Sequence, residues 1–215
     1  MKPMKKTFRN ILGKFRSQFQ MNRPGTETEA VIMKEWERNG CPVPPPHVVK
    51  QRIIKEYQQR YKYSTFIETG TYLGDMVEAQ KSSFKKLISI ELSSELYLKA
   101  RNRFKNDSNV LIVQGDSGKQ LPEILRTLTE PAIFWLDGHY SEGKTAKGDK
   151  DCPIFEELDA ILGHSIYAHV ILIDDARYFV GKGDYPQVEA LAEYILGKNQ
   201  NYKMEVKHDI IRFTV

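Results

Sequence analysis

Short runs of apolar, largely β-branched residues alternate along the chain with longer segments whose apolar residues recur every three or four positions. The first pattern is typical of buried strands and the second of amphipathic helices. We expect strands at about 64–68, 87–91, 110–114, 132–137 and 169–174, and helices at about 48–61, 75–84, 93–105, 117–128, 153–163 and 185–197. Two final apolar runs, 202–206 and 210–215, are separated by only three residues, which predicts a closing hairpin.

This alternation predicts an α/β fold with a doubly wound, mostly parallel sheet, because right-handed crossovers place successive parallel strands in one open sheet. The hairpin adds an antiparallel edge, for seven strands in all. Residues 46–215 would form this domain, and residues 1–45 a basic, helical N-terminal extension with a proline-rich linker. Within the extension, Thr26 and Glu29 match a capping box, and Gly40 matches a helix end.

Charge is unevenly distributed over the chain. Residues 1–23 hold seven of the 32 Lys and Arg residues and none of the 28 acids, so the remainder is slightly acidic. This argues against nucleic acid as a partner of the domain. The basic segment has helical periodicity, which suits weak contact with a membrane surface, packing on its own domain, or a poorly ordered terminus. No segment matches a membrane span or a secretory signal, so we expect a cytoplasmic protein.

A glycine-containing loop follows the first strand of the domain. Glu68 ends that strand, Gly70 and Gly74 lie in the loop, and Glu91 ends the next strand seventeen residues after Gly74. Glycine permits positive φ and close approach of a ligand, and a carboxylate at the next strand end can hold the two hydroxyls of a ribose. The pattern predicts a nucleotide-type site. It lacks the G-x-G-x-x-G of dehydrogenases and the G-K-[ST] of P-loop proteins.

Three acids follow the fourth and fifth strands: Asp137 after the fourth, and Asp174 with Asp175 after the fifth. Oxygen donors without a nearby cysteine suit a hard cation such as Mg²⁺, which would orient an acceptor hydroxyl and lower its pKa. His139 would then take the proton. The alternative is that these acids cap turns and His139 is a surface residue. Adjacent strand residues point to opposite faces, so Asp174 and Asp175 converge only if the chain bends between them.

These motifs resemble those of the class I S-adenosylmethionine-dependent methyltransferases. Residues 68–74 are similar to their first motif, although Tyr72 stands where a middle glycine is common. The segments 136–139 and 173–175 are similar to the L-D-G-D and I-D-D segments of the metal-dependent macrocin and sugar O-methyltransferases. The resemblance implies S-adenosylmethionine as cofactor, bound by Glu68, Thr69, Gly70, Thr71, Tyr72, Gly74, Glu91, Asp116, Ser117 and Asp137.

The resemblance implies an O-methyltransferase that acts, with a divalent metal, on a hydroxyl of a sugar or other small polar metabolite. Asp137 and His139 are the expected catalytic residues, Asp137, Asp174 and Asp175 the metal ligands, and His139, Tyr140, Lys144 and Arg177 the residues near the acceptor. The alternatives are a cephalosporin-hydroxylase-like or metal-independent enzyme of the same fold, and a noncatalytic cofactor-binding module in glycan assembly. Assembly as a homo-oligomer is left open.

Overall fold

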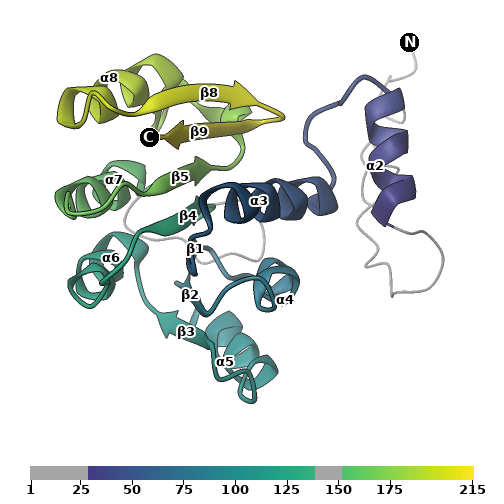
Figure 1. Cartoon of the computed structure of the whole chain (residues 1–215), viewed down its shortest axis with the longest axis vertical. Helices are drawn as coiled ribbons and strands as arrows, with labels where there is room; N and C mark the ends of the chain where they lie inside the picture. Colours follow the sequence, from purple (N-terminus) through teal and green to yellow (C-terminus); the bar gives the residue numbers. More distant parts are fainter. Residues whose placement is uncertain (1–28, 139–151) are drawn as a thin grey trace, which may run out of the picture.

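The computed structural model describes residues 29–138 and 152–215, and it contains the expected seven-stranded sheet (Figure 1). The strand order is β3-β2-β1-β4-β5-β9-β8, parallel except where β9 pairs with β5 and β8. The strands are β1 (Thr65–Thr69), β2 (Lys86–Glu91), β3 (Val110–Gln114), β4 (Ala132–Leu136), β5 (Val170–Ile173), β8 (Lys203–Lys207) and β9 (Ile210–Thr214). The fold class predicted from the sequence is confirmed.

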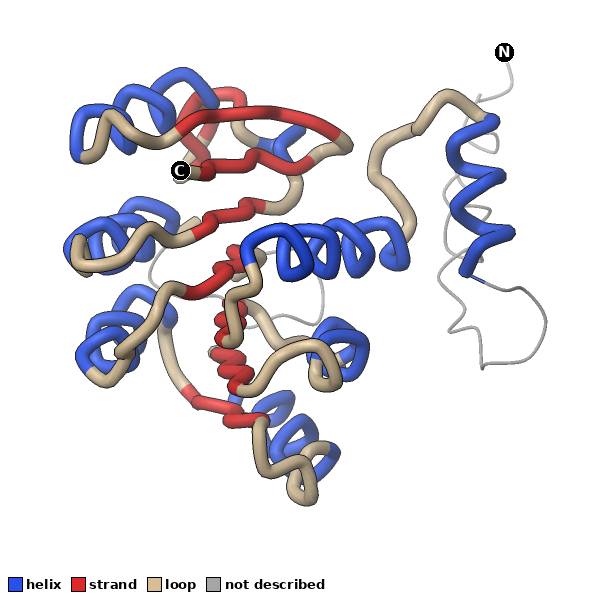
Figure 2. The backbone as a smooth tube through the Cα atoms, viewed as in Figure 1, coloured by secondary structure: helices blue, strands red, loops and turns tan. Residues whose placement is uncertain are grey.

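Helices cover both faces of the sheet (Figures 1 and 2). One layer holds α3 (His47–Tyr61), α4 (Asp75–Gln80) and α5 (Ser94–Arg103). The other holds α6 (Ser117–Arg126), α7 (Ile154–Gly163) and α8 (Val188–Lys198).

Two separate hydrophobic cores follow from the twofold periodicity of the strands. In β1, Phe66 packs toward α3, α4 and α5, whereas the next residue, Ile67, packs toward α6, α7 and α8. In β4, Ile133 and Trp135 belong to the first core and Phe134 to the second. Because both faces are buried, β4 and β5 are continuous apolar runs, as expected for a parallel sheet.

The described part of the N-terminal extension is α2 (Glu29–Arg38), which is joined to α3 by the proline-containing segment. Trp36 anchors it: the indole is buried, stands edge-on to the His208 ring at 4.8 Å, and donates a 2.9 Å hydrogen bond from Nε1 to the Pro42 carbonyl. The capping residue Thr26 and the basic segment 1–23 lie outside the described residues. The domain boundary near residue 45 stays a prediction.

Two element boundaries differ from expectation by three residues or more. Helix α4 ends at Gln80 rather than at 84. A turn follows it, in which the Ser83 amide donates to the Gln80 carbonyl. The helix expected at 185–197 begins instead at Val188, because residues before it form a small ribbon of β6 (Val180–Lys182) and β7 (Tyr185–Gln187). Its turn uses Gly183 at positive φ, and Pro186 disfavours helical backbone in the residue before it.

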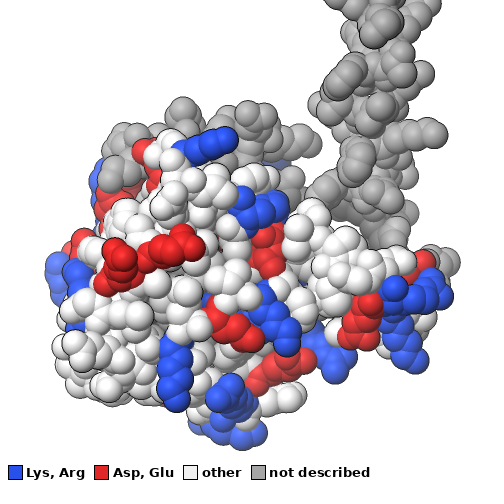
Figure 3. All heavy atoms as spheres, turned by 90° about the horizontal axis from the view of Figure 1, so that it is seen from above, with Lys and Arg blue, Asp and Glu red and all other residues white. Residues whose placement is uncertain are grey.

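None of the helices within 29–138 and 152–215 is long and apolar enough to cross a membrane. On the face shown in Figure 3, acidic and basic side chains are interspersed.

Two leucines on helices should differ in how much they contribute to stability, because one belongs to the second core and the other lies on the surface. Leu121 on α6 is fully buried, whereas Leu98 on α5 is 59% exposed. We expect Leu121→Ala to lower the free energy of unfolding by about 2–5 kcal/mol, because it removes buried methyl groups and leaves a cavity. Leu98→Ala should change it by less than about 0.5 kcal/mol. Urea denaturation of both variants measures the difference, and equal losses would contradict the assignment of the core.

Candidate functional site

The ends of the five parallel strands meet at one edge of the sheet. Just past the paired strands, the amides of Gly70, Gly115, Asp137 and Asp174 donate to carbonyls of the neighbouring strand ends at 2.9–3.2 Å. These bonds keep the adjacent ends level with one another. The strand-end acids predicted from the sequence are therefore brought to a common rim.

The loop after β1 is built from alternating left-handed residues. Gly70, Tyr72 and Gly74 have φ of +86°, +49° and +81°. Tyr72 thus adopts a conformation that glycine adopts more easily. This agrees with the glycine that is common at the corresponding position of the methyltransferase motif that residues 68–74 resemble. Gly70 has a further constraint, because a Cβ there would lie 2.4 Å from the Asp137 carbonyl oxygen.

Glu91 joins this loop to the end of β2. Its Oε2 accepts a hydrogen bond from the Tyr72 amide and its Oε1 accepts one from the Ser93 amide, both at 2.8 Å. Burial raises the pKa of Glu91, and the hydrogen bonds from the Ser93, Tyr72 and Leu92 amides act against this rise. A carboxylate has about four lone-pair sites. Three amides use most of these sites, so Glu91 is held in place by the backbone, and its contact with a ribose stays a prediction.

Glu68 and Thr71 lie in the interior, beneath the loop. Glu68 is 2% exposed and accepts a 2.8 Å hydrogen bond from Ser89 Oγ, which is 2.6 Å from Thr71 Oγ1. Burial raises the pKa of Glu68 well above its ordinary value. These contacts support the loop from below. Direct contact of either side chain with a cofactor stays a prediction.

The start of α6, which follows β3, contacts the first turn of α7. Asp116 caps α6 by accepting a 2.9 Å hydrogen bond from the Gly118 amide. Ser117 Oγ donates to Glu157 Oε1 at 2.5 Å, and a Cβ on Gly138 would lie 3.1 Å from the same oxygen. Glu157 was not among the residues singled out from the sequence, although it is only 2% exposed at the rim.

Asp137, Asp174 and Asp175 come together, as their positions after neighbouring strands predicted. Each offers a carboxylate oxygen, and these oxygens all lie within 4.8 Å of one another. Asp174 is fully buried. The bend required between Asp174 and Asp175 is present, because Asp175 has a left-handed φ of +56° and its amide donates to Asp174 Oδ1 at 2.8 Å.

A lysine that was not anticipated enters this cluster from α3. Lys50 Nζ lies 2.5 Å from Asp174 Oδ2 and 3.2 Å from Asp175 Oδ1. Burial favours the neutral amine, yet the charges of Asp174, Asp175 and Asp137 raise the pKa of Lys50. Burial and the charge of Asp137 raise the pKa of Asp174 well above its ordinary value, with Lys50 acting against them. One ammonium thus faces three carboxylates.

Arg177, predicted to lie near the acceptor, is held by two acids. Its Nη1 donates to Asp175 Oδ1 at 2.7 Å and also to Asp209 Oδ2. Its guanidinium carbon lies 4.4 Å from the centre of the Tyr178 ring. These contacts tie β5 to the β8–β9 turn, and a role toward an acceptor stays a prediction. His139, Tyr140 and Lys144 lie outside the described residues.

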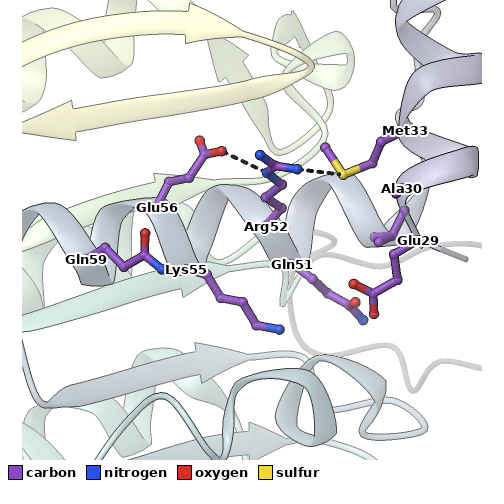
Figure 4. Close-up of a pocket in the computed structure, with 9 residues that line it drawn as sticks. Glu29, Ala30, Met33, Gln51, Arg52, Lys55, Glu56 and Gln59 are labelled. Carbon is purple, nitrogen blue, oxygen red and sulfur yellow. Dashed lines mark hydrogen bonds and ion pairs between the residues drawn. The ribbon is translucent and has the colours of Figure 1, made fainter.

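A groove of about 540 Å³ lies away from the aspartates, between α2 and α3 (Figure 4). Arg52 crosses it, with Nε donating to Glu56 at 3.2 Å and Nη1 lying 3.5 Å from Met33 Sδ. Lys55 also lines the groove. Helix α3 therefore directs Lys50 to the strand ends and Lys55 to a different surface.

Several solved structures share this architecture. An O-methyltransferase from Bacillus cereus in complex with S-adenosylhomocysteine (SAH) has a TM-score of 0.58 at 14% identity, covering 95% of this chain and 97% of that one. TomG from Streptomyces achromogenes, an O-methyltransferase of tomaymycin synthesis in complex with S-adenosylmethionine (SAM), has a TM-score of 0.58 at 16% identity, covering 99% of both chains. The chain has the class I methyltransferase fold.

A SAH-bound methyltransferase from Podospora anserina is also similar, with a TM-score of 0.54 at 14% identity over 100% of this chain and 97% of that one. No family model and no curated protein matches the chain in sequence. At these identities the likeness establishes the fold alone, so the activity has to be argued from the site.

The close approach at Gly70 generates a matched test of the loop. Gly40 also has positive φ, at +79°, but nothing lies within 4 Å of a Cβ placed there. Both alanine variants carry backbone strain, and only Gly70→Ala also meets the Asp137 main chain. We expect Gly70→Ala to lose about 1–3 kcal/mol more unfolding free energy than Gly40→Ala. Thermal and urea denaturation measure this, and equal losses would show that the two strand ends do not touch.

Proposed function

We propose that the chain is a SAM-dependent O-methyltransferase that acts on a hydroxyl of a sugar or other small polar metabolite. The observation that carries the proposal is Glu91, a backbone-held carboxylate at a strand end beside a loop of left-handed residues. A carboxylate accepts hydrogen bonds, which suits the hydroxyl donors of the cofactor's ribose. The class I methyltransferase fold, shared with structures that hold SAM or SAH, adds support.

When bound, SAM supplies an electrophilic methyl group on a positively charged sulfur. An acceptor oxygen forms the new C–O bond with its lone pair, while the S–CH₃ bond breaks and its electrons remain on sulfur. The hydroxyl proton must leave during this step, since a neutral alcohol is a weak nucleophile. In this proposal His139, two residues after Asp137, takes the proton.

A divalent metal was expected at the three aspartates, and their oxygen donors suit Mg²⁺. As arranged in the described residues, however, the cluster already contains the Lys50 ammonium between two of the three carboxylates. The set does not fit a divalent ion while Lys50 stays in place. We therefore favour the metal-independent form of the reaction.

The partners follow from the same site. We propose a small-molecule or glycan acceptor and no nucleic acid, which agrees with the interspersed charges on the face in Figure 3. Weak membrane-surface contact through residues 1–23 stays a prediction. Cofactor binding without turnover would favour the noncatalytic module in glycan assembly.

Cofactor binding is tested at Glu91. We expect Glu91→Gln to weaken SAH binding by roughly 10- to 100-fold, because hydrogen bonds to a charged carboxylate are lost. The control is Glu95→Gln, which lies four residues further along on an exposed helical surface. It should bind SAH like the wild type. Isothermal titration calorimetry measures both, and a wild type that does not bind SAH would end the proposal.

Catalysis is tested at His139. We expect His139→Ala to lower turnover roughly 10²-fold or more while SAH affinity stays unchanged. The control, His164→Ala, changes a histidine at the C-terminal end of α7, before β5 begins. Transfer of a labelled methyl group to a pooled glycan extract gives the rates. Equal rates in the two variants would remove His139 from the reaction.

A further inference from the structure

Lys50 occupies a position that an amphipathic helix normally gives to an apolar residue. Ile53, Ile54 and Tyr57 lie three, four and seven residues after it on α3, and all three are buried. Helix α3 lies over the middle of the sheet beside β4 (Figure 1), so this face is turned toward the protein interior. A lysine here needs a buried partner, because burying an unpaired charge is strongly unfavourable.

The partners are the acids at the strand ends. Side-chain exposure is 13% for Lys50, 1% for Asp174 and 12% for Asp175. The Lys50 ammonium is therefore shielded from bulk water and held by two carboxylates from a segment more than a hundred residues away. The contacts of Lys50 with Asp174 and Asp175 are therefore those of a buried ion pair and not of a surface ion pair.

A divalent ion would have to share this space. Mg²⁺ bound to Asp174 Oδ2 at about 2.1 Å would lie within about 4.6 Å of the Lys50 ammonium, given the 2.5 Å between Nζ and that oxygen. In a site shielded from water, the two cations would repel each other strongly. The same two carboxylates can hold the ammonium or the ion, but not both at full occupancy.

We propose that Lys50 is the resident cation of this site and replaces a divalent metal. Its charge holds Asp174 and Asp175 in their converging geometry, and its remaining N–H presents positive charge toward the acceptor oxygen. The second role rests on the proposed methyl transfer, whereas the first does not. Lys50, which comes from outside the strand ends, is then part of the reaction site. The reaction then needs no added metal.

The test is Mn²⁺ binding to the full chain, measured by calorimetry and by the shift of Tm at ~1 mM Mn²⁺. We expect no saturable binding and no rise in Tm for the wild type. Lys50→Met removes the ammonium and leaves the Arg177 guanidinium, at the edge of the cluster on Asp175, beside the three carboxylates. This variant should therefore gain Mn²⁺ binding and a Tm rise of several degrees. Lys50→Arg, which keeps a cation, should remain indifferent to Mn²⁺.

Lys55→Met is the matched control, since Lys55 lies on the same helix but lines the groove beside α2 (Figure 4). It should behave like the wild type. Saturable Mn²⁺ binding to the wild type that Asp174→Asn abolishes would overturn the proposal. So would a folded Lys50→Met variant that gains no Mn²⁺ binding. If Lys50→Met does not fold, the wild-type and Lys50→Arg titrations still decide between the ammonium and the ion.

Activity supplies a separate readout. If the chain transfers methyl groups, EDTA should leave the wild-type rate unchanged. Transfer that requires Mg²⁺ would overturn the role of Lys50 and leave the proposed function standing. If no methyl transfer is found and Mn²⁺ binding is gained only in Lys50→Met, the proposed function would be wrong and the structural role of Lys50 would stand.

Discussion

Three carboxylates lie within 4.8 Å of one another at the ends of β4 and β5, and the Lys50 ammonium and the Arg177 guanidinium offset their repulsion. Breaking a buried pair of this kind leaves an uncompensated charge and typically costs about 3–5 kcal/mol. The pairing also fixes where α3 can lie, because Lys50 must reach Asp174 while Ile54 and Tyr57 fill the core beneath the helix. The N-terminal helix of the domain and its last parallel strand are thus joined at the candidate site.

The rim depends on hydrogen bonds that extend the sheet by one residue past β1, β3, β4 and β5. They set Glu91, Asp137 and Asp174 level, although these residues are widely spaced in sequence. The loop after β1 then closes one side, through the left-handed Tyr72 whose amide binds Glu91. The fold is shared with methyltransferases at 14–16% identity.

Much of the fold follows from local patterns in the sequence. The continuous apolar runs of β4 and β5 indicate strands buried on both faces, and an acid within two residues of the end of each parallel strand indicates where the rim lies. Lys50 and Glu157 were not anticipated because their roles depend on contacts with residues distant in sequence. A signal was present in both cases. Each is a charged residue on the buried face of its helix, among Ile53 and Ile54 for Lys50 and among Ile154, Leu158 and Ile161 for Glu157.

The small ribbon before α8 carried no such signal, since its strands have three residues each and β6 is exposed. The role of His139 was inferred from its position in the sequence, and it lies outside the described residues. The most direct measurement of the account is a crystal structure of the chain grown with SAH and Mn²⁺, with anomalous diffraction data collected for manganese. The account predicts SAH with its ribose on Glu91, Lys50 Nζ between Asp174 and Asp175, and no anomalous peak there. A manganese ion bound by Asp137, Asp174 and Asp175, with Lys50 turned away, would contradict it.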